Sequence, residues 1–366
     1  MRITIGGVVP LLLCGFAPLA PAAGRTLYVA PGGGDTRTCL SAAEACATIG
    51  RAASLTLPGD EVQIAAGRYP GPVWIGRGGS ASQPIFYRFA AGARLEHDPS
   101  DDVSLFTLDV AAPYVRIVGG EVVGTLRSIS YDQAQANYRA EKASGKAPTH
   151  QRFNQYCIAV RADHVLISGV YVHDCAGAGI YAQNVDDVEI SSNRVERTGW
   201  WSIQDPSGID FHYGRTPAGG GAKGVRIRVN TVRDSANSVP FWQDPLNAKP
   251  TDGNGIMVDR AQGLDPRYAG IVLIEGNVVE RSGGSGIRAY RSTGVTMNKN
   301  IVSGSHSCPV KGANCGDENG ELNYNLASGT VTNNTVRAAA GRRALFAYES
   351  KVALGGNSFT GPVEVR

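Results

Sequence analysis

Residues 188–195, VEISSNRV, return along the chain as VRIRVNTV at 225–232, VLIEGNVV at 272–279 and VTMNKNIV at 295–302. The same frame continues at 331–336 and 352–359, and each copy has an apolar residue two places after an Asn. The six Asn positions are separated by 37, 47, 23, 34 and 23 residues. A pattern with a base period of about 23 and insertions in some copies is typical of a repeat protein. The aligned residues are Asn193, Asn230, Asn277, Asn300, Asn334 and Asn357.

Each copy alternates apolar and polar residues before the Asn, which indicates a short strand with one buried face. Because a single copy cannot bury its apolar face alone, the copies are expected to stack. Asn tolerates the left-handed conformation that sharp bends require, so we expect the six Asn to form a ladder inside one bend. A leucine-rich repeat has a similar period but needs a Leu framework that is missing here. The sequence therefore predicts an all-β fold, a single-stranded right-handed parallel β-helix of about seven or eight coils.

A second strand frame precedes the Asn frame by about 13–16 residues and indicates another sheet of the same solenoid. Long connections at about 124–153, 214–223, 234–254 and 304–320 are expected to loop out over one face. The N-terminal part, about 24–65, is expected to cap the first coil, with helical spacing from Ser41 to Leu55. The second-frame strands lie at 157–160, 179–182, 208–211, 255–258, 286–289, 321–324 and 344–347.

The first 22 residues are expected to be a signal peptide. Arg2 precedes an apolar run at about 3–19, and Ala20-Pro21-Ala22 is a small-x-small cleavage signal. The mature chain, 23–366, is then one secreted or periplasmic domain without membrane insertion, and we expect a monomer. Removing residues 1–22 takes away only Arg2 among the charged residues and lowers the formal net charge from +3 to +2. This small charge, with no Lys/Arg run, does not indicate a nucleic-acid partner.

Six of the seven Cys remain in the mature chain, an even number that favours disulfides in an exported protein. No Cys-x-x-Cys motif occurs and no His lies beside a Cys pair, so a zinc site is not indicated. Their spacing along the chain predicts Cys39–Cys46, Cys157–Cys175 and Cys308–Cys315.

Ionisable side chains gather on three successive coils of the second frame. Alternate side chains of a strand point outward, and neighbouring coils lie about 4.8 Å apart. One patch, roughly 10 Å across, is therefore expected to hold Asp210, His212, Asp259, Arg288 and Tyr290.

This set suits removal of the proton next to the carboxylate of a uronic acid, which needs a base and a cation that stabilises the developing charge. Arg288, or Arg260 at the strand end, is expected to neutralise the substrate carboxylate. His212 is the expected base, because its unperturbed pKa lies near neutrality. Tyr290 is expected to donate a proton or to exchange roles with His212.

The carboxylates have two candidate roles. Asp210 and Asp259 either hold a Ca²⁺ that bridges enzyme and uronate or orient His212. Further candidates for contacts with the sugar, whose aromatic members serve packing equally well, are Tyr181, Gln183, Tyr213 and Trp242.

Several segments resemble secreted pectate-lyase-like β-helix proteins. The resemblance spans nearly the whole mature chain and implies the β-helix fold, while that superfamily includes lyases, hydrolases, epimerases and non-catalytic tail fibres. Met257 stands where one branch of pectate lyases has a Lys. The segments are YVAPGGGD at 28–35, ATI at 47–49, PGD at 58–60, GRY at 67–69, DGNGI at 252–256 and GIR at 286–288.

A shorter stretch, GIDFH at 208–212, resembles the Asp-Pro-His segment of alginate C5-epimerases, with Phe211 in place of Pro. An Arg-bearing strand follows one coil later at 255–260, as in those enzymes. We therefore expect a carbohydrate-active enzyme that removes the C5 proton of a uronate in an acidic polysaccharide, ending in β-elimination. The alternatives are a C5-epimerase, a glycoside hydrolase with Asp210 and Asp259 as the paired carboxylates, and a non-catalytic carbohydrate-binding β-helix.

Overall fold

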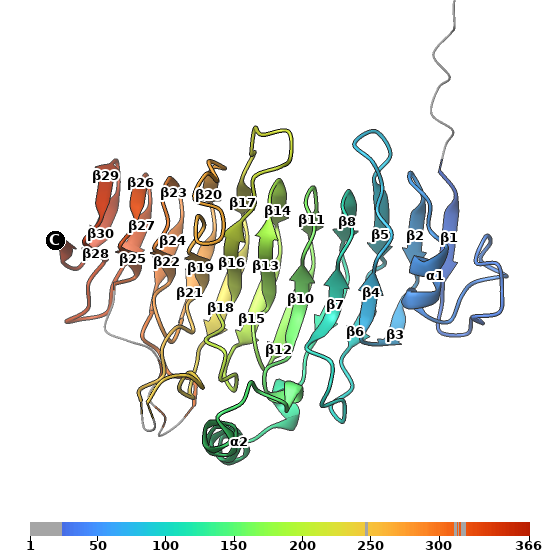
Figure 1. Ribbon diagram of the computed structural model, residues 1–366, viewed down its shortest axis with the longest axis horizontal. Coiled ribbons are helices and arrows are strands. Elements are labelled where there is room, and N and C mark those ends of the chain that lie inside the picture. Colours follow the sequence, from blue (N-terminus) through green and yellow to red (C-terminus); the bar gives the residue numbers. More distant parts are fainter. Residues whose placement is uncertain (1–23, 246–247, 311–312, 314, 316–319) are drawn as a thin grey trace, which may run out of the picture.

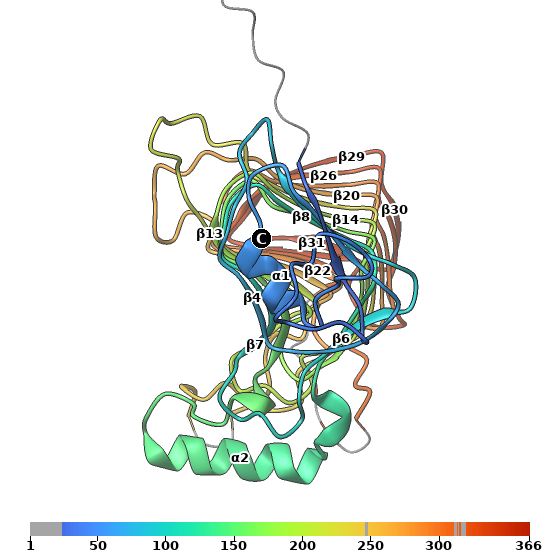
Figure 2. The ribbon, with the colours of Figure 1, turned by 90° about the vertical axis from the view of Figure 1, so that its right-hand side faces the viewer.

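The computed structural model describes residues 24–245, 248–310, 313, 315 and 320–366, so the expected signal peptide lies outside the described residues. The described chain is one elongated solenoid of parallel strands (Figure 1). Each coil contributes one strand to sheet A, then one to sheet B and one to sheet C, so the view along the long axis shows stacked rings (Figure 2). No described helix is long and apolar enough to cross a membrane.

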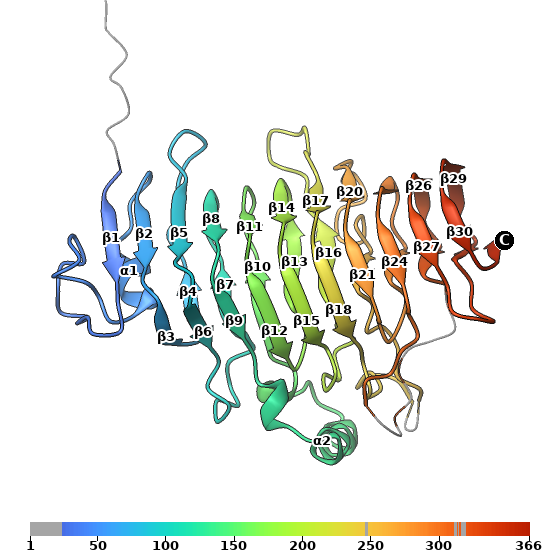
Figure 3. The ribbon, with the colours of Figure 1, turned by 180° about the vertical axis from the view of Figure 1, so that it is seen from behind.

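Sheet A contains β1 (Thr26–Val29), β2 (Glu61–Ile64), β5 (Ile85–Phe89), β8 (Val115–Val118), β11 (Leu166–Ser168), β14 (Val188–Ser191), β17 (Val225–Arg228), β20 (Val272–Glu275), β23 (Val295–Asn298), β26 (Ser328–Thr332) and β29 (Lys351–Gly355). Sheet B, seen from behind in Figure 3, contains β3 (Gly67–Pro70), β6 (Ala93–Glu96), β9 (Glu121–Val123), β12 (Tyr171–Cys175), β15 (Arg194–Thr198), β18 (Thr231–Ser235), β21 (Val278–Glu280), β24 (Ile301–Ser303), β27 (Thr335–Arg337) and β30 (Ser358–Thr360). Sheet C contains β4 (Val73–Ile75), β7 (Phe106–Val110), β10 (Tyr156–Val160), β13 (Ile180–Val185), β16 (Ile209–Gly214), β19 (Ile256–Asp259), β22 (Ile287–Tyr290), β25 (Leu322–Asn325), β28 (Leu345–Tyr348) and β31 (Val363–Val365).

The core is the column of inward side chains that stack from coil to coil. The second frame is sheet C, and its expected inward residues, such as Ile209 and Phe211, are fully buried. Each buried Ile contributes roughly 1.5–3 kcal/mol of transfer free energy. In the described residues the sheets hold eleven, ten and ten strands, so the solenoid has more coils than the seven or eight expected. The additional coils come from residues 26–96, which contain β1, β2 and β5 of sheet A and where Gly92 forms an A-to-B bend without an Asn.

The Asn ladder is confirmed at the bend between sheets A and B. The backbone N–H of Asn230 donates to Oδ1 of Asn277 over 2.9 Å, and the same bond links all six Asn in order. The left-handed conformation, however, belongs to the residue before the Asn, as at Ser192 (φ 57°) and Val229 (φ 55°), and the expectation for Asn was wrong. The reason is that the Asn side chain must turn inward to reach the next coil, so the preceding residue makes the bend.

The N-terminal end of the solenoid is closed by α1 (Ile49–Leu55), which lies over the end of the first coil (Figure 2). Thr48 caps this helix by accepting a hydrogen bond from the N–H of Arg51. The helix is shorter than the helical spacing from Ser41 predicted. The disulfide Cys39–Cys46 ties residues 39–46 into a loop, which keeps them out of the helix.

Three of the four long connections lie at the start of the sheet C strands, as expected for loops on one side, but the fourth, 215–224, lies at the opposite ends of these strands, where the expectation was wrong. Residues 124–155 and the described parts of 236–255 and 304–321 belong to the B-to-C bend, and 215–224 belongs to the C-to-A bend (Figure 2). The first segment forms two 3-10 turns, η1 (Leu126–Ser128) and η2 (Gln151–Phe153), around α2 (Tyr131–Ser144). A capping box of Ser130 and Gln133 starts α2, and Gly145 in the left-handed conformation ends it.

A second hydrophobic cluster lies between α2 and the neighbouring loops. Tyr138 of α2 packs in a cluster with Trp201 and Val239, and Trp242 packs against that cluster. Nζ of Lys142 also donates to the carbonyl of Trp242 over 2.9 Å. The helix therefore holds the 236–245 loop against the body of the solenoid.

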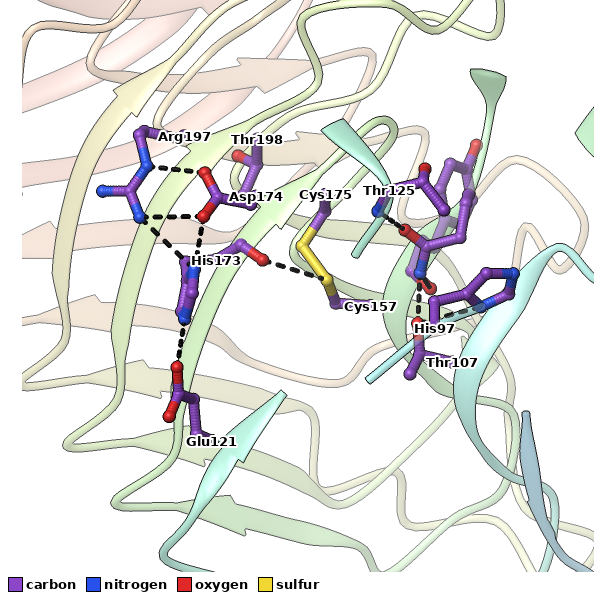
Figure 4. The surroundings of a disulfide bond; sticks show 12 residues. His97, Thr107, Glu121, Thr125, Cys157, His173, Asp174, Cys175, Arg197 and Thr198 are labelled. Carbon is purple, nitrogen blue, oxygen red and sulfur yellow. Dashed lines mark hydrogen bonds and ion pairs between the residues drawn. A yellow bond between two sulfur atoms is a disulfide. The ribbon is translucent and has the colours of Figure 1, made fainter. Parts of the chain in front are cut away.

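The three expected disulfides are confirmed, with Cα–Cα distances of 5.0, 5.7 and 5.1 Å in chain order. The second disulfide joins Cys157 near the start of β10, in sheet C, to Cys175 at the end of β12, in sheet B of the next coil. Beside Cys175 lies a buried charged group in which His173 contacts Asp174 and Glu121 (2.7 and 2.6 Å), and Arg197 contacts Asp174 (Figure 4).

Candidate active site

Four consecutive strands of sheet C bring the predicted residues into one place. β13, β16, β19 and β22 pair in parallel register, which aligns His212 with Asp259 and Asp259 with Tyr290. The same register aligns Asp210 with Met257 and then with Arg288. Alternation along strands of fixed period therefore places these side chains on three adjacent coils, as the sequence predicted.

A cleft of about 660 Å³ covers this part of sheet C, between the sheet and the B-to-C loops. It is lined by eight of the ten non-cysteine candidates from the sequence, namely Asp210, His212, Asp259, Arg260, Arg288, Tyr290, Tyr181 and Trp242. The two others lie beside it. Gln183 is the neighbour of His212 on β13, and the ring of Tyr213 stacks on the His212 ring with centroids 3.9 Å apart.

His212 lies between a phenol and a carboxylate. Its Nδ1 is 3.2 Å from the hydroxyl of Tyr181, and its Nε2 is 3.1 Å from Oδ2 of Asp259. A neutral imidazole with its proton on Nε2 accepts the hydrogen bond of the Tyr181 hydroxyl at Nδ1, while Nε2 lies close to Asp259 without a hydrogen bond to any described residue. The contacts form a continuous line, Tyr181–His212–Asp259.

Burial changes the protonation behaviour of this line. Desolvation, with the nearby Arg260 guanidinium, lowers the pKa of His212 to about 4. The sequence-based expectation of a pKa near neutrality was therefore wrong, because the ring is buried and lies near a positive charge. Desolvation also raises the pKa of Asp259 to about 6, against the opposing influence of Arg260. At neutral pH, His212 is neutral and Asp259 is ionised.

Asp210 is a buried carboxyl group at the floor of the cleft, with 7% of its surface exposed. Its Oδ1 accepts no hydrogen bond from any residue in the described ranges. Burial, and then the charges of Asp259, Asp252 and Asp205, raise its pKa well above the usual range. Asp210 is therefore suited to remain protonated and to donate a proton.

The two guanidinium groups of the cleft are both near carboxylates. Nη1 of Arg288 lies 3.2 Å from Oδ1 of Asp252, and Nη1 of Arg260 lies 3.3 Å from Oδ2 of Asp259. Both guanidinium carbons also lie near the ring of Tyr290, at 5.3 and 5.5 Å from its centroid. Arg288 is only 9% exposed, so any anion that reaches it is largely removed from water.

Sequence reasoning missed three carboxyl groups that line the same cleft, Asp205, Asp244 and Asp252. Asp205 and Asp252 occupy equivalent places in their coils. A signal was present, since each stands four residues before a buried Ile that begins a sheet C strand, Ile209 and Ile256. Equivalent places in successive coils are neighbours in space. Accordingly, burial and the charge of Asp252 raise the pKa of Asp205 well above its usual range.

Within the described residues, no group of three or more His, Cys, Asp and Glu side chains is arranged to hold a metal ion. Asp259 instead contacts His212 and Arg260. The Ca²⁺ site expected at Asp210 and Asp259 stays a prediction.

A comparison with known protein families agrees with the fold. A family model for the right handed beta helix region matches residues 152–365, and no curated protein sequence matches the chain. Among solved structures, the chain is similar to an alginate lyase from Paenibacillus sp. str. FPU-7 (15% identity, 93% of this chain, 97% of that chain, TM-score 0.43). It is also similar to the pectate lyase Pel9A (16%, 94%, 82%, 0.46) and to the A-module of the Azotobacter vinelandii mannuronan C-5 epimerase AlgE4 (12%, 84%, 91%, 0.33). Because the family model covers more than half of the sequence, the chain belongs to the right-handed β-helix family.

Proposed function

We propose that the protein is an exported enzyme that removes the C5 proton of a uronate residue in an acidic polysaccharide and completes a β-elimination. The observation that carries this proposal is the line Tyr181–His212–Asp259 in a cleft shared with Arg260 and Arg288. It combines a neutral base with guanidinium groups, which are the two requirements of this reaction. The three disulfides favour an oxidising compartment, outside the cytoplasm.

The base in this proposal acts through the Tyr181 hydroxyl. As the hydroxyl takes the C5 proton, its own proton passes to Nδ1 of His212, and the resulting imidazolium is stabilised by the Asp259 carboxylate. The two transfers must be concerted, because burial raises the pKa of Tyr181 further above its usual value and disfavours a free tyrosinate. A guanidinium group of Arg288 or Arg260 stabilises the negative charge that develops on the substrate carboxylate.

The leaving oxygen receives its proton from Asp210. The electron pair of the broken C5–H bond forms the C4–C5 double bond, the C4–O4 bond breaks, and O4 takes the carboxyl proton. The raised pKa of Asp210 keeps that proton available at neutral pH. If O4 stays bonded and Tyr290 returns a proton to the opposite face of C5, the same first step gives epimerisation instead.

The protonation states also matter for substrate binding. The cleft is lined by the side chains of Asp205, Asp210, Asp244, Asp252 and Asp259, against two Arg. Five charged carboxylates would repel an anionic polymer. The raised pKa of Asp205 and Asp210 reduces this repulsion, so the cleft is most suited to a uronate while both remain protonated.

A second candidate is glycoside hydrolysis on the same surface. Its support is that the cleft holds several carboxyl groups with different proton affinities, with the pKa of Asp259 at about 6 and that of Asp210 higher than usual. An acid and a carboxylate on either side of a glycosidic bond are the requirement of that reaction.

The test is a panel of pectate, alginate and hyaluronan incubated with the purified protein, alongside a Tyr181→Phe variant. We expect one polymer to yield products with the ultraviolet absorbance of an unsaturated uronate, and the variant to lose turnover by at least ~100-fold. New reducing ends without this absorbance would replace elimination by hydrolysis. Neither product, with inversion at C5 seen by proton NMR, would indicate epimerisation.

A further inference from the structure

A large exposed ring lies on the same sheet as the cleft but nearer the N-terminus. Trp74, the central residue of β4, is 64% exposed. Its indole lies over Gly76, where an added Cβ would come within 2.0 Å of a ring carbon. The absence of a side chain at Gly76 therefore lets the indole lie flat along the sheet. A single exposed apolar side chain is common on protein surfaces, so the significance of Trp74 depends on the groups beside it.

Trp74 forms one side of a depression of about 210 Å³, and Phe106 of the next strand, β7, forms another. The depression has polar groups at its edge. Asp109 lines it and forms an ion pair with Arg161, whose guanidinium carbon lies 5.6 Å from the centroid of the Phe106 ring. A flat apolar ring with polar groups beside it matches a sugar ring, which presents C–H groups on its face and hydroxyl groups at its edge.

A line of aromatic rings joins this depression to the cleft. Phe106 and Tyr156 have ring centroids 6.0 Å apart, and Tyr156 and Tyr181 have centroids 5.0 Å apart. Both tyrosines line the cleft. The rings come from β7, β10 and β13, which lie side by side along the long axis (Figure 1). A line of aromatic rings therefore connects the depression to the cleft, with Phe106 half-buried and Tyr156 buried beneath the surface of sheet C.

The length of this surface fits a polymer. β4 and β16 are separated by four coil steps, so Trp74 lies about 19 Å from His212 along the axis. A sugar unit and a coil step are similar in length, so this distance corresponds to roughly four sugar units.

We propose that Trp74 and Phe106 form a distal sugar-binding site that holds the polymer chain about four units from the reacting uronate. The occupant is the acidic polysaccharide itself, and in this respect the inference rests on the proposed function. The site contributes affinity for long chains and takes no part in the chemical step. Substrates too short to reach Trp74 do not use it.

The experiment compares Trp74→Ala with Trp74→Phe, which keeps a stacking face, and with Leu354→Ala, which removes an exposed apolar side chain (45% exposed) from sheet A. Binding is measured by retardation in native gels containing alginate or polygalacturonate, and kinetics with the same polymers and with their trisaccharides. We expect Trp74→Ala to weaken polymer binding and raise KM for the polymer about 10-fold. The kcat on polymer and kcat/KM on trisaccharide should stay within twofold, with Trp74→Phe intermediate and Leu354→Ala unchanged.

Two results would overturn the inference: a wild-type protein that neither polymer retards, and a Trp74→Ala protein retarded as strongly as the wild type. An equal loss on trisaccharides would also overturn it, because it would mean a general structural effect. Retardation that depends on Trp74, in a protein that turns over neither polymer, would support the distal site and reject the proposed reaction.

Discussion

Replacing Asp259 by Asn should remove a specific limb from the pH dependence of activity. In the wild type, kcat/KM should fall as pH drops through the pKa of Asp259, about 6, because the protonated carboxyl no longer stabilises the His212 imidazolium. One ionisation gives about a 10-fold loss per pH unit below 6, and the loss steepens below about 4, where His212 itself becomes protonated. In Asp259→Asn the limb near 6 should be absent, with a plateau at least ~100-fold lower.

The same change should alter stability in a pH-dependent way. Burial raises the folded-state pKa of Asp259 from 3.8 to about 6, so ionising this carboxyl destabilises the folded protein. The stability that its protonated form gives is present in full below the unfolded pKa and is lost as pH rises through 6. At 1.36 kcal/mol per pKa unit, the ionised carboxyl costs up to about 3 kcal/mol at pH 7. Asp259→Asn should therefore be more stable than the wild type at pH 7, with the difference closing toward pH 4.

The assays are initial rates from pH 4 to 8 on the responsive polymer, and urea unfolding at pH 4 and 7 with the disulfides intact. Asp132→Asn, on the exposed side of α2, is the matched control and should change neither profile. A limb near pH 6 that persists in Asp259→Asn would show that another group controls the reaction. A stability difference that is the same at pH 4 and 7 would refute the assignment of the raised pKa.

Four further outcomes are expected. His212→Ala and Arg288→Ala should each lower turnover by at least ~100-fold with unchanged circular dichroism, and full activity in both would contradict the site. Asn277→Leu should lower the free energy of unfolding by about 2–6 kcal/mol, because the buried N–H of Asn230 and the carbonyl of Ile227 lose their partners. Asn357→Leu, at the half-buried end of the ladder, should lower it less when both variants are measured by urea unfolding. Thiol titration of the denatured, unreduced mature protein should find no free Cys, and several free thiols would argue against the three disulfides. If Asp210 and Asp259 hold Ca²⁺, adding Ca²⁺ should move the pH 6 limb downward and EDTA should restore it, whereas an unchanged limb would exclude that site.

The sequence was sufficient for the fold because the repeat determines it. Each bend residue, such as Asn277, predicts a strand before it and a strand after it, and the repeat period predicts which strands of neighbouring coils pair. The coils at 26–96 were harder to see, because a Gly at the A-to-B bend, such as Gly92, leaves no side chain to align. The alignment of His212 with Asp259 and Tyr290 also followed from the period, since adjacent coils bring equivalent positions together.

The environment of the site could not be obtained in this way. The low pKa of His212 comes from burial and the Arg260 guanidinium, and strand alternation predicts neither how deeply a ring is buried nor where a long side chain such as Arg260 ends. The contact of Tyr181 with His212 is diagonal, since Tyr181 pairs directly with Asp210 in the sheet. A long side chain reaches across the register, and strand alternation alone does not predict this.

The Asn ladder has a consequence for how such proteins change their specificity. Neighbouring Asn are 37, 47, 23 and 34 residues apart, and yet the hydrogen bonds that join them are 2.8 to 3.0 Å long in every step. The geometry of the Asn ladder therefore does not depend on how many residues are inserted between two of its Asn, provided that the inserted loop begins and ends at the same bend of the coil. The segment 236–255, between Asn230 and Asn277, is such an insertion. Replacing a loop at the B-to-C bend by one of different length should change the cleft while the Asn ladder keeps its register. The protein is therefore a suitable scaffold for grafted recognition loops.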